Sequence, residues 1–563
     1  MIPDSPDPFY YLANFERALG WLTARCADLF DTGEARFAQR FGTLPRASRA
    51  LFVRMLMRKG PHFRAGRLDY AEIGCPRAAA AALVAEGWID EAPTLALDAL
   101  APLVTKADLQ ALAVSLGIAV DVRATRAATL AVLEDAAPAP RGWHAWFPES
   151  ADTAFHLAAA PLCERLRLMF FGNLRQDWSE FVLADLGIYR YESVPFDAAS
   201  RAFHHRDDID TWLALRDCRE RLETAPETIA VALDTLDALA PRTQDNAWLR
   251  TRHDRVRHAA GQAAERAREP ALALRAYLDC GHPEARYRRV RVLEQLGRRD
   301  EATALARAIA TAPVNEEEAQ RAARTLGRLQ RQRGSPSPQG AASAQTGAMA
   351  ELTLPEAKAD LRVEEATRLA LASDEAPVFY VENTLINSLF GLLCWPALFA
   401  PLPGAFFHPF QRGPADLHAA DFVTRRADRF AACLAELETR SYRETIERRY
   451  IEKSGVQSPF VAWPALSRDL LTLALDCFPA VHLRLWFERL LRDPTANRSG
   501  LPDLVRFWPA ERRYELIEVK GPGDRLQDNQ RRWLAYCAAH AIPVTVLQVR
   551  WAAAPLALDA TAP

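Results

Sequence analysis

The chain has 563 residues, of which 49% are hydrophobic and 25% charged, and its formal net charge is -2. This length is enough for about three or four compact domains, each with its own core. No apolar run approaches the roughly 20 residues that cross a bilayer, and the N-terminal residues lack the basic and apolar segments of an export signal. The composition argues against a membrane protein and predicts a cytoplasmic one.

The cysteines and the charge balance further restrict the class of protein and the kind of DNA site that can be expected. The nine cysteines are odd in number, widely scattered and free of any C-x-x-C pair, so neither a disulfide framework nor a zinc finger is expected. A net charge near zero is not the global signature of a nucleic-acid-binding protein. Any DNA site must therefore be built from local clusters of arginine and lysine.

The first 140 residues are predicted to be helical. Apolar residues return every three or four positions in residues 1–90, which we expect to form an N-terminal helical domain. Residues 91–140 are predicted to form a short helical hairpin, in which Thr105 caps the start of a helix and Gly117 ends it.

The central part is also predicted to be helical and ends in a linker. Within residues 141–333, the stretch 247–330 contains two similar Ala- and Arg-rich helix pairs, which suggest a tetratricopeptide-like solenoid. Residues 334–350 are rich in Gly, Ser, Pro, Ala and Gln and have no apolar periodicity. They are therefore predicted to be a linker before a last domain at 351–563.

The last domain is expected to change from helices to an α/β pattern. Helices are predicted around VENTLINSLFGLLCWPALF and between residues 421 and 452. LVRFWP and YELIEVK then read as strands, DRLQDNQRRWLAYCAAH as a helix and VTVLQVRW as a strand. This order places the charged residues of the segment at strand ends.

A group of three charged residues in this segment carries the chemistry. Asp503 precedes the first strand, and Glu518 and Lys520 alternate with Val519 on the second, so both charged side chains face the same side. A hairpin would bring Asp503 beside Glu518, where two carboxylates repel each other unless a divalent cation lies between them. The pattern predicts a metal-dependent phosphodiesterase, although an E-x-K triplet also arises by chance in solvated strands.

The flanking residues add a resemblance to a known family. GLPDL and EVKGPGDRLQDNQ in residues 498–551 resemble the VRR-NUC domain of the PD-(D/E)xK nucleases. FYYLANFERAL, FVRMLMRKG, TKADLQALAVSLG and SEFVLADLG precede it in an order similar to that of the Fanconi-associated nuclease family. The resemblance implies a mostly α, multidomain protein that has a helical N-terminal domain, a SAP-like hairpin, tetratricopeptide-like repeats and a C-terminal α/β nuclease domain.

The same resemblance implies a function and further ligands. Family members are structure-specific DNA endonucleases and 5′-3′ exonucleases that cut near 5′ flaps in DNA repair, including interstrand cross-link repair. Branched or flapped DNA is the implied partner, Mg²⁺ or Mn²⁺ the implied cofactor, and the cytoplasm or a bacterial nucleoid the implied location. Glu382, before an apolar helical run, maps to a further acidic ligand, and the main-chain carbonyl of Val519 is another candidate. The less favoured alternative for Glu382 is a first-turn glutamate that interacts with a helix dipole.

Two basic regions are candidates for DNA binding. Arg58 and Lys59, with His62, Arg64 and Arg67 nearby, form the densest N-terminal cluster and would suit a duplex backbone or a 5′ phosphate. Arg525 and Gln530, near the start of the last helix, could contact phosphate or orient Lys520. For both regions, ordinary solvated helix residues are an equally good interpretation.

The sequence departs from the family pattern at two places, and two other functions remain as alternatives. Ala124-Thr125-Arg126 stands where SAP motifs usually have a glycine-containing turn, which puts that hairpin's DNA contact in doubt. The ubiquitin-binding zinc finger of larger members has no counterpart in this sequence. A symmetric dimer could instead resolve four-way junctions, or the repeats could make the chain a protein-binding scaffold with a weak nuclease. The intact Asp503, Glu518 and Lys520 set argues against a degenerate nuclease.

Overall fold

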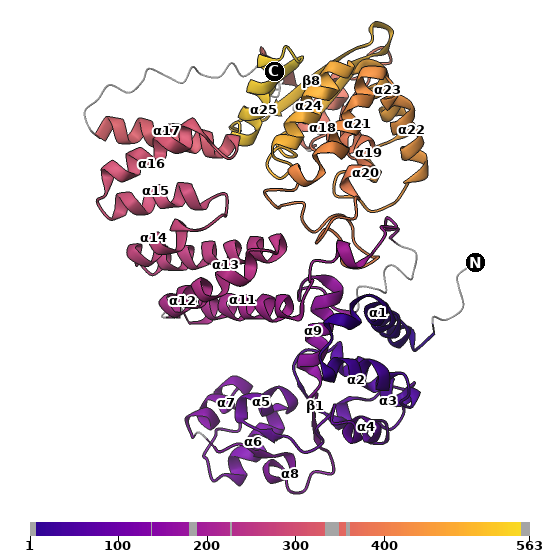
Figure 1. Ribbon diagram of the computed structural model, residues 1–563, viewed down its shortest axis with the longest axis vertical. Helices are drawn as coiled ribbons and strands as arrows, with labels where there is room; N and C mark the ends of the chain where they lie inside the picture. Colours follow the sequence, from indigo (N-terminus) through magenta and orange to yellow (C-terminus); the bar gives the residue numbers. More distant parts are fainter. Residues whose placement is uncertain are drawn as a thin grey trace, which may run out of the picture. The chain divides into compact units, whose positions relative to one another are not determined.

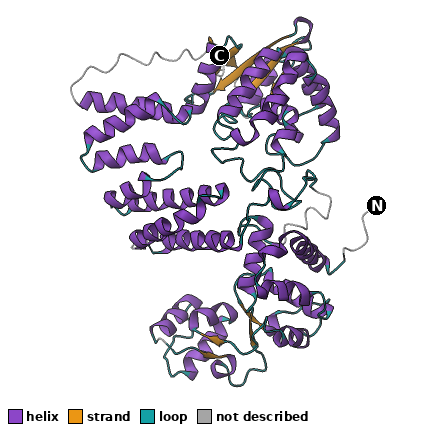
Figure 2. Ribbon diagram, in the orientation of Figure 1, coloured by secondary structure: helices purple, strands orange, loops and turns teal. Residues whose placement is uncertain are grey.

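The computed structural model describes residues 7–136, 138–178, 189–225, 228–332, 348–355 and 361–552. The chain forms two compact units (Figure 1). Unit 1 comprises residues 1–189 and 203–209, and unit 2 comprises residues 190–202 and 210–563. Helices dominate, and the one sheet of more than two strands among these residues lies in the C-terminal part of unit 2 (Figure 2). The predicted fold class is thereby confirmed.

Unit 1 begins with four helices around an aromatic core. They are α1 (Tyr10–Cys26), α2 (Thr32–Phe41), α3 (Arg46–Leu56) and α4 (Pro76–Ala85). Buried rings pack edge to face or tilted against one another within this group, namely Phe15, Phe37, Phe41, Phe52 and Trp88. Aromatic pairs in such arrangements add to the stability that burial alone provides, so the predicted helical periodicity corresponds to one continuous core.

The predicted helical hairpin follows, with the expected signals at its ends. Helices α6 (Lys106–Ser115) and α7 (Arg126–Asp135) pack together. The Thr105 hydroxyl accepts a hydrogen bond from Asp108 N, and the Asp108 carboxylate accepts one from Thr105 N, which makes a capping box. Gly117 has a φ of 71°, the left-handed conformation that glycine adopts most easily after a helix.

Residues 141–178, which we expected to share a domain with the helical repeats, belong instead to unit 1. Strand β4 (Ala154–His156) pairs antiparallel with β1 (His62–Arg64), and α9 (Ala160–Phe171) packs on α1. Arg165 of α9 also donates to Glu34, whose side chain is fully buried. The helical pattern of residues 141–178 was visible in the sequence, but the unit against which they pack is decided by these long-range contacts.

Unit 2 contains the predicted helical repeats. The helices are α11 (Arg206–Thr224), whose residues up to Ile209 are counted in unit 1, α12 (Ile229–Leu239), α13 (Ala247–Arg266), α14 (Pro270–Leu278), α15 (Ala285–Gln295), α16 (Arg299–Thr311) and α17 (Glu316–Gln332). From α13 onward each helix packs on the next (Figure 1). Small residues allow this close approach: a Cβ on Gly261 would lie 2.4 Å from the ring of Tyr277. Residues 334–347 of the expected linker lie outside the described residues.

The C-terminal sheet has the strand order β5-β9-β8-β7-β6. The strands are β5 (Ala348–Leu354), β6 (Val378–Tyr380), β7 (Leu504–Trp508), β8 (Arg513–Lys520) and β9 (Val544–Trp551). β7 is antiparallel to β6 and β8, whereas β9 is parallel to β5 and β8. The predicted strand, strand, helix, strand order is confirmed. The predicted linker ended at residue 350, which was wrong by three residues, because β5 begins at Ala348 and pairs with the distant β9.

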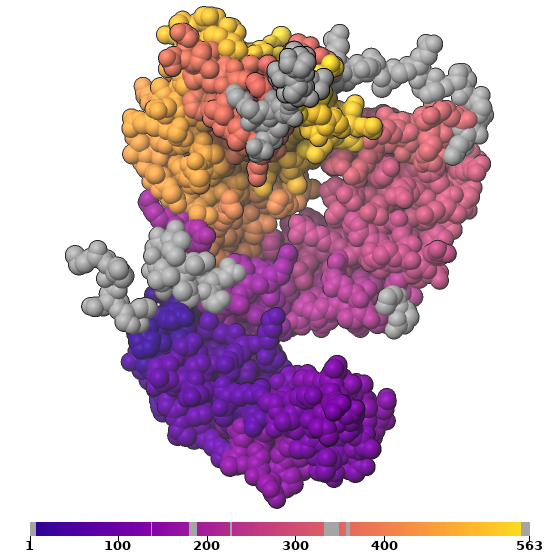
Figure 3. Space-filling model, turned by 180° about the vertical axis from the view of Figure 1, so that it is seen from behind, coloured from indigo at the N-terminus to yellow at the C-terminus, as the bar shows by residue number. Residues whose placement is uncertain are grey.

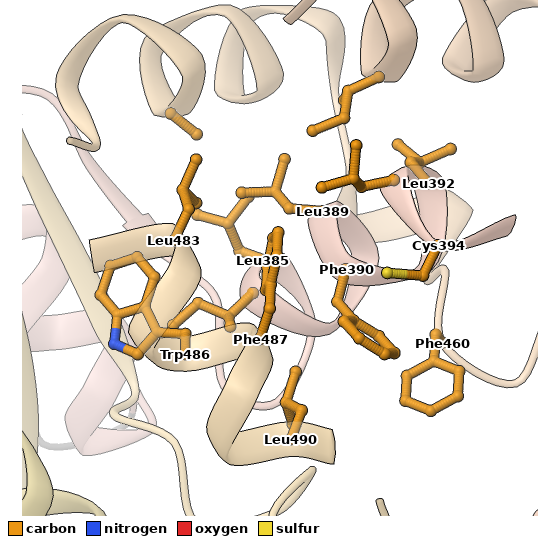
Figure 4. Packing of buried hydrophobic residues seen from close by; sticks show 14 of the residues in the cluster. Leu385, Leu389, Phe390, Leu392, Cys394, Phe460, Leu483, Trp486, Phe487 and Leu490 are labelled. Carbon is orange, nitrogen blue, oxygen red and sulfur yellow. The ribbon is translucent and has the colours of Figure 1, made fainter. Parts of the chain in front are cut away.

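Helices cover the sheet and form a large core. They are α18 (Val363–Leu371), α19 (Leu385–Leu393), α20 (Trp395–Leu398), α21 (Ala427–Thr439), α22 (Tyr442–Glu452), α23 (Arg468–Cys477), α24 (Ala480–Arg492) and α25 (Asp528–Ala539). Apolar residues of α19 and α24 interlock in the centre of this core (Figure 4). Leu516 of β8 faces this core, and its neighbour Ile517 faces a smaller core that includes α18 residues. Both faces of the sheet are therefore covered, which buries the charged side chain of Glu518 on β8.

No single helix of the described residues is long and apolar enough to cross a membrane. The pair α23 and α24 meets the length and composition criteria together, but it bends by 108° between its halves. Apolar side chains of both helices belong to the large core of this domain.

The last solenoid helix is joined to the C-terminal α/β domain through ion pairs. Arg489 of α24 is 2% exposed, and its guanidinium donates to both oxygens of Glu316 on α17, at 2.9 and 2.7 Å. Arg324 of α17 likewise pairs with Asp528 at the start of α25, at 2.8 and 2.7 Å. In Figure 3 the yellow C-terminal residues accordingly meet the pink residues of the solenoid's end.

Candidate active site

The hairpin of β7 and β8 brings the two predicted carboxylates together. Leu504 lies opposite Ile517, so the antiparallel register places Asp503 opposite Glu518. Val519 N donates to Asp503 Oδ2 at 2.8 Å, which fixes that carboxylate against the end of β8. Val519 itself points into the smaller core on the other side of the sheet. The alternation expected from the E-V-K triplet is therefore observed.

Lys520 provides a positively charged side chain at this corner of the sheet. Its Nζ lies 2.8 Å from Glu518 Oε1, and its side chain is only 12% exposed. Apart from this ion pair, neither carboxylate oxygen of Glu518 has a hydrogen-bonding partner among the described residues. One lysine thus faces two acids, and the negative charge is left without full compensation inside the protein.

The buried acids hold their protons unusually tightly. Asp503 is 6% exposed and Glu518 is 1% exposed. Burial raises the pKa of Asp503 to about 6; the hydrogen bond from Val519 N opposes this shift, and the charge of Glu382 adds to it. Burial also raises the pKa of Glu518 to about 7, and the neighbouring Asp503 contributes in the same direction. Carboxylates that are desolvated and crowded in this way gain from a bound cation.

Glu382 approaches the same corner from a different part of the chain. It lies between β6 and α19, and Val381 N donates to the carbonyl oxygen of Asp503 at 2.8 Å. Its carboxylate accepts hydrogen bonds from the Tyr380 hydroxyl, at 2.5 Å, and from Asn383 Nδ2, at 3.1 Å. We expected Glu382 on the helix, but it lies before it, where Asn383 has a φ of 53°. The first-turn, helix-dipole interpretation therefore loses its basis.

The oxygen donors fit a hard divalent cation. Three carboxylates near one sheet corner, two of them buried, supply the donor type that Mg²⁺ and Mn²⁺ prefer, and the Glu518 oxygens without hydrogen-bonding partners point to a missing positive charge. In the described part of the chain, no three acidic, histidine or cysteine side chains are already spaced as a complete ligand set. The Glu382 carboxylate is turned toward Tyr380 and Asn383 instead.

Two further groups near this corner were not predicted from the sequence. The Tyr380 hydroxyl holds Glu382, and burial together with that hydrogen bond raises the pKa of Tyr380. Glu364 of α18 lies close enough that its charge contributes to the raised pKa of Asp503. No local pattern marks either residue, although Tyr380 and Glu382 are two positions apart, as residues on one strand face would be.

The N-terminal basic cluster is smaller than its sequence suggested. Arg64 is paired with both Asp108 and Asp152, at 3.1 and 2.7 Å, so its charge is neutralised within unit 1. Arg58 and Lys59 are exposed, and Arg58 Nη1 donates to the Arg67 carbonyl oxygen.

A cavity of about 280 Å³ lies next to this cluster in unit 1. Its lining includes Arg58 together with Arg167 and Trp178. His62 is half-buried beside the ring of His156, at 4.7 Å between ring centres.

The two candidates near the last helix differ in their surroundings. Gln530 Oε1 accepts a hydrogen bond from Gln527 N at 2.9 Å and so helps to cap α25. Arg525 is exposed in the turn between β8 and α25. Its position leaves the guanidinium accessible to an external anion.

Family models and relatives match this architecture. Residues 9–90 match the family model described as FAN1, HTH domain, and residues 437–551 match the VRR-NUC domain. The chain is 50% identical over 551 residues to a Fanconi-associated nuclease 1 homolog from Pseudomonas aeruginosa, covering 98% of this chain and 97% of the relative. The chain belongs to the Fanconi-associated nuclease family. It is a nuclease, and the VRR-NUC domain implies dependence on a divalent metal.

More distant members and solved structures agree with that assignment. A family homolog from Arabidopsis thaliana is 24% identical over 604 residues, covering 97% of this chain and 67% of the relative. A crystal structure of paFAN1 bound to 2nt 5′ flap DNA with gap is 49% identical and superposes with a TM-score of 0.87, covering 98% of this chain and 100% of that chain. A second paFAN1 structure, bound to 1nt 5′ flap DNA with gap, superposes with a TM-score of 0.84. The family fold therefore extends over nearly the whole chain.

Proposed function

We propose that this chain is a structure-specific DNA nuclease that hydrolyses phosphodiester bonds near 5′ flaps, with Mg²⁺ or Mn²⁺ as cofactor, in DNA repair including interstrand cross-link repair. The observation that carries the proposal is the buried Asp503–Glu518 pair, for which Lys520 is the one positively charged partner among the described residues. The flap-bound paFAN1 structures support the choice of substrate class.

In this proposal the chain supplies four groups to the cation. Asp503, Glu518 and Glu382 provide carboxylate oxygens, and Val519 provides its main-chain carbonyl. A bound divalent cation would lower the pKa of an attacking water and neutralise charge on the scissile phosphate. The sheet keeps Asp503 and Glu518 in register before substrate arrives, because their backbones are paired through β7 and β8.

Lys520 acts on the reacting groups rather than on the fold. Its ammonium, held 2.8 Å from Glu518, donates toward the attacking water or a phosphate oxygen. A fixed positive charge in a poorly hydrated corner stabilises the negative charge that develops in the transition state. We also propose that Arg58 and Lys59 in unit 1, and Arg525 with Gln530 near α25, contact the DNA backbone.

Cleavage of defined DNA structures tests this proposal. The purified full chain should cut a labelled 5′-flap duplex in Mg²⁺ or Mn²⁺ and lose that activity in chelator. Ca²⁺ should support binding better than cleavage. Full activity in chelator would contradict the metal mechanism, symmetric cleavage of a four-way junction in preference to the flap would favour a resolvase, and metal binding without cleavage would favour a scaffold.

A further inference from the structure

Two arginines beside the candidate active site lack the acidic partners that surround most buried arginines of unit 2. Arg498 is half-buried and Arg412 is exposed. Within the described ranges neither forms an ion pair, and Nη1 of Arg498 is buried without a hydrogen-bonding partner. A guanidinium that is partly removed from water without a counter-ion is costly. Its charge is therefore available to an external anion.

Both arginines contact the same short segment, residues 458–460. Arg412 Nε donates to the Ser458 carbonyl oxygen at 3.1 Å, and Arg498 lies over the Phe460 ring, 5.7 Å from the ring centre. The Phe460 ring is itself anchored in the core by Phe390, at 5.0 Å between ring centres (Figure 4). Both side chains thus extend from a rigid support, which lowers the entropy lost when they grip a ligand.

Several positively charged groups lie near Arg498. Burial lowers the pKa of Arg498, and the positive charge of Arg412 adds to the effect. Burial also lowers the pKa of His418, and Arg498 and Arg255 of the solenoid act in the same direction, while Asp493 opposes them. The folded chain therefore concentrates positive potential around Arg498.

Hydrogen bonds connect this cluster to the catalytic corner. Asn387 Nδ2 donates to the carbonyl oxygens of both Arg498 and Asn383, at 2.9 and 2.8 Å. Asn383 Oδ1 in turn accepts from Leu501 N, and its amide donates to Glu382. Arg498 also begins the short loop that leads to Asp503. The cluster and the acids are consequently held at a fixed separation.

We propose that Arg498 and Arg412 form a phosphate-binding site that grips an internal phosphodiester of the DNA backbone beside the cleavage site. This inference rests on the proposed nuclease function and adds a residue-level contact to it. Guanidinium groups suit this ligand because their planar donors match phosphate oxygens in pairs. Contacts of this kind position DNA without reading its sequence, so the site should set where the flap junction lies relative to Asp503.

Binding of flap DNA in Ca²⁺, followed by fluorescence anisotropy at several salt concentrations, tests the site. Arg498→Gln should weaken binding about tenfold and lower the salt slope by about one, and the double variant with Arg412→Gln should lower it by about two. Arg498→Lys should keep the slope, which separates loss of charge from loss of folding. Arg443→Gln is the matched control, since Arg443 is already paired with Asp476 and should change neither quantity.

Neutral backbone substitutions identify the phosphate involved. A methylphosphonate placed at successive positions near the flap junction should weaken wild-type binding at one position and leave Arg498→Gln unaffected there. The effect should be equal for flaps with a 5′ phosphate and a 5′ hydroxyl; dependence on the 5′ phosphate would overturn the internal-phosphodiester assignment. If the wild type cleaves the flap but the Arg498 and Arg412 variants keep its affinity and salt slope, the phosphate-binding site is rejected and the proposed nuclease function stands. If the wild type cleaves no flap, the proposed function fails first.

Discussion

At Asp416 the protein neutralises a buried carboxylate with its own arginines, whereas at Asp503 and Glu518 it does not. Asp416 is 3% exposed and accepts hydrogen bonds from Arg425 and from Arg426, which is itself 1% exposed. Asp503 and Glu518 are just as buried, yet they face each other and Lys520. Equally buried carboxylates therefore differ in their surroundings: the charge of Asp416 is compensated by arginines, and we propose that the Asp503–Glu518 pair is compensated by a bound cation.

The largest difference should appear when a carboxylate charge is removed from the proposed catalytic corner around Asp503, Glu518 and Lys520. Glu518→Gln keeps the side-chain shape, and it should lower flap cleavage by about 10³-fold or more because metal and water positioning are lost. Thermal stability should stay the same or rise, because a buried like-charge contact disappears. Single-turnover cleavage and thermal unfolding of the same preparation measure both effects. Glu511→Gln, at the exposed turn before β8, should change neither; near-normal turnover in Glu518→Gln would remove that residue from the site.

The compensated site should respond in the opposite manner. Asp416→Asn leaves Arg426 buried beside a neutral partner, and the free energy of unfolding should fall by about 3–5 kcal/mol. Asp476→Asn, which breaks an exposed pair with Arg443, should cost less than about 1 kcal/mol. Urea unfolding monitored by tryptophan fluorescence compares the two. Equal losses would mean that burial of the ion pair contributes nothing to stability.

Glu382 should respond less strongly, because it lies at the edge of the catalytic corner. Glu382→Gln should raise the Mg²⁺ or Mn²⁺ concentration needed for half-maximal cleavage by about 10- to 100-fold and lower the maximal rate. Tyr380→Phe removes only the hydrogen bond to Glu382 and should give a smaller shift in the same titration. A metal titration unchanged by Glu382→Gln would exclude that carboxylate from the ligand set.

The smallest expected effect is the dependence of metal affinity on pH. Because the pKa is about 6 for Asp503 and about 7 for Glu518, protons compete with the cation in this range. Metal affinity should rise by up to about tenfold per pH unit between roughly pH 6 and 7 and level off above. The pair's contribution to metal-free stability should run the other way, falling as pH rises from about 4 to about 7, since the folded state binds the proton more tightly. Calorimetric titration in buffers of different ionisation enthalpy measures the released protons. A pH-independent affinity would contradict these shifts.

Local patterns were enough to predict the elements and the strand-borne charges. The alternation in YELIEVK placed Glu518 and Lys520 on one face, and the structure has that arrangement because a strand turns each successive side chain to the opposite face. Thr105 and Gly117 marked the ends of a helix for equally local reasons, since a cap or a left-handed residue acts within one turn. Motif resemblance added Glu382, which no periodicity could have selected.

Only the tertiary structure decided which charges are compensated. The sequence grouped Arg64 with Arg58 and Lys59, but folding gives Arg64 two aspartates from distant segments. It likewise gives Asp416 its arginines, and it places no acidic partner on Arg498 from the part of the chain that the structure describes. Residues 141–178 joined unit 1 through pairing of β4 with β1, which their own helical and polar pattern did not indicate. Periodicity follows from the geometry of the backbone between near neighbours, whereas compensation of a charge depends on which remote side chain packing brings within a few ångströms.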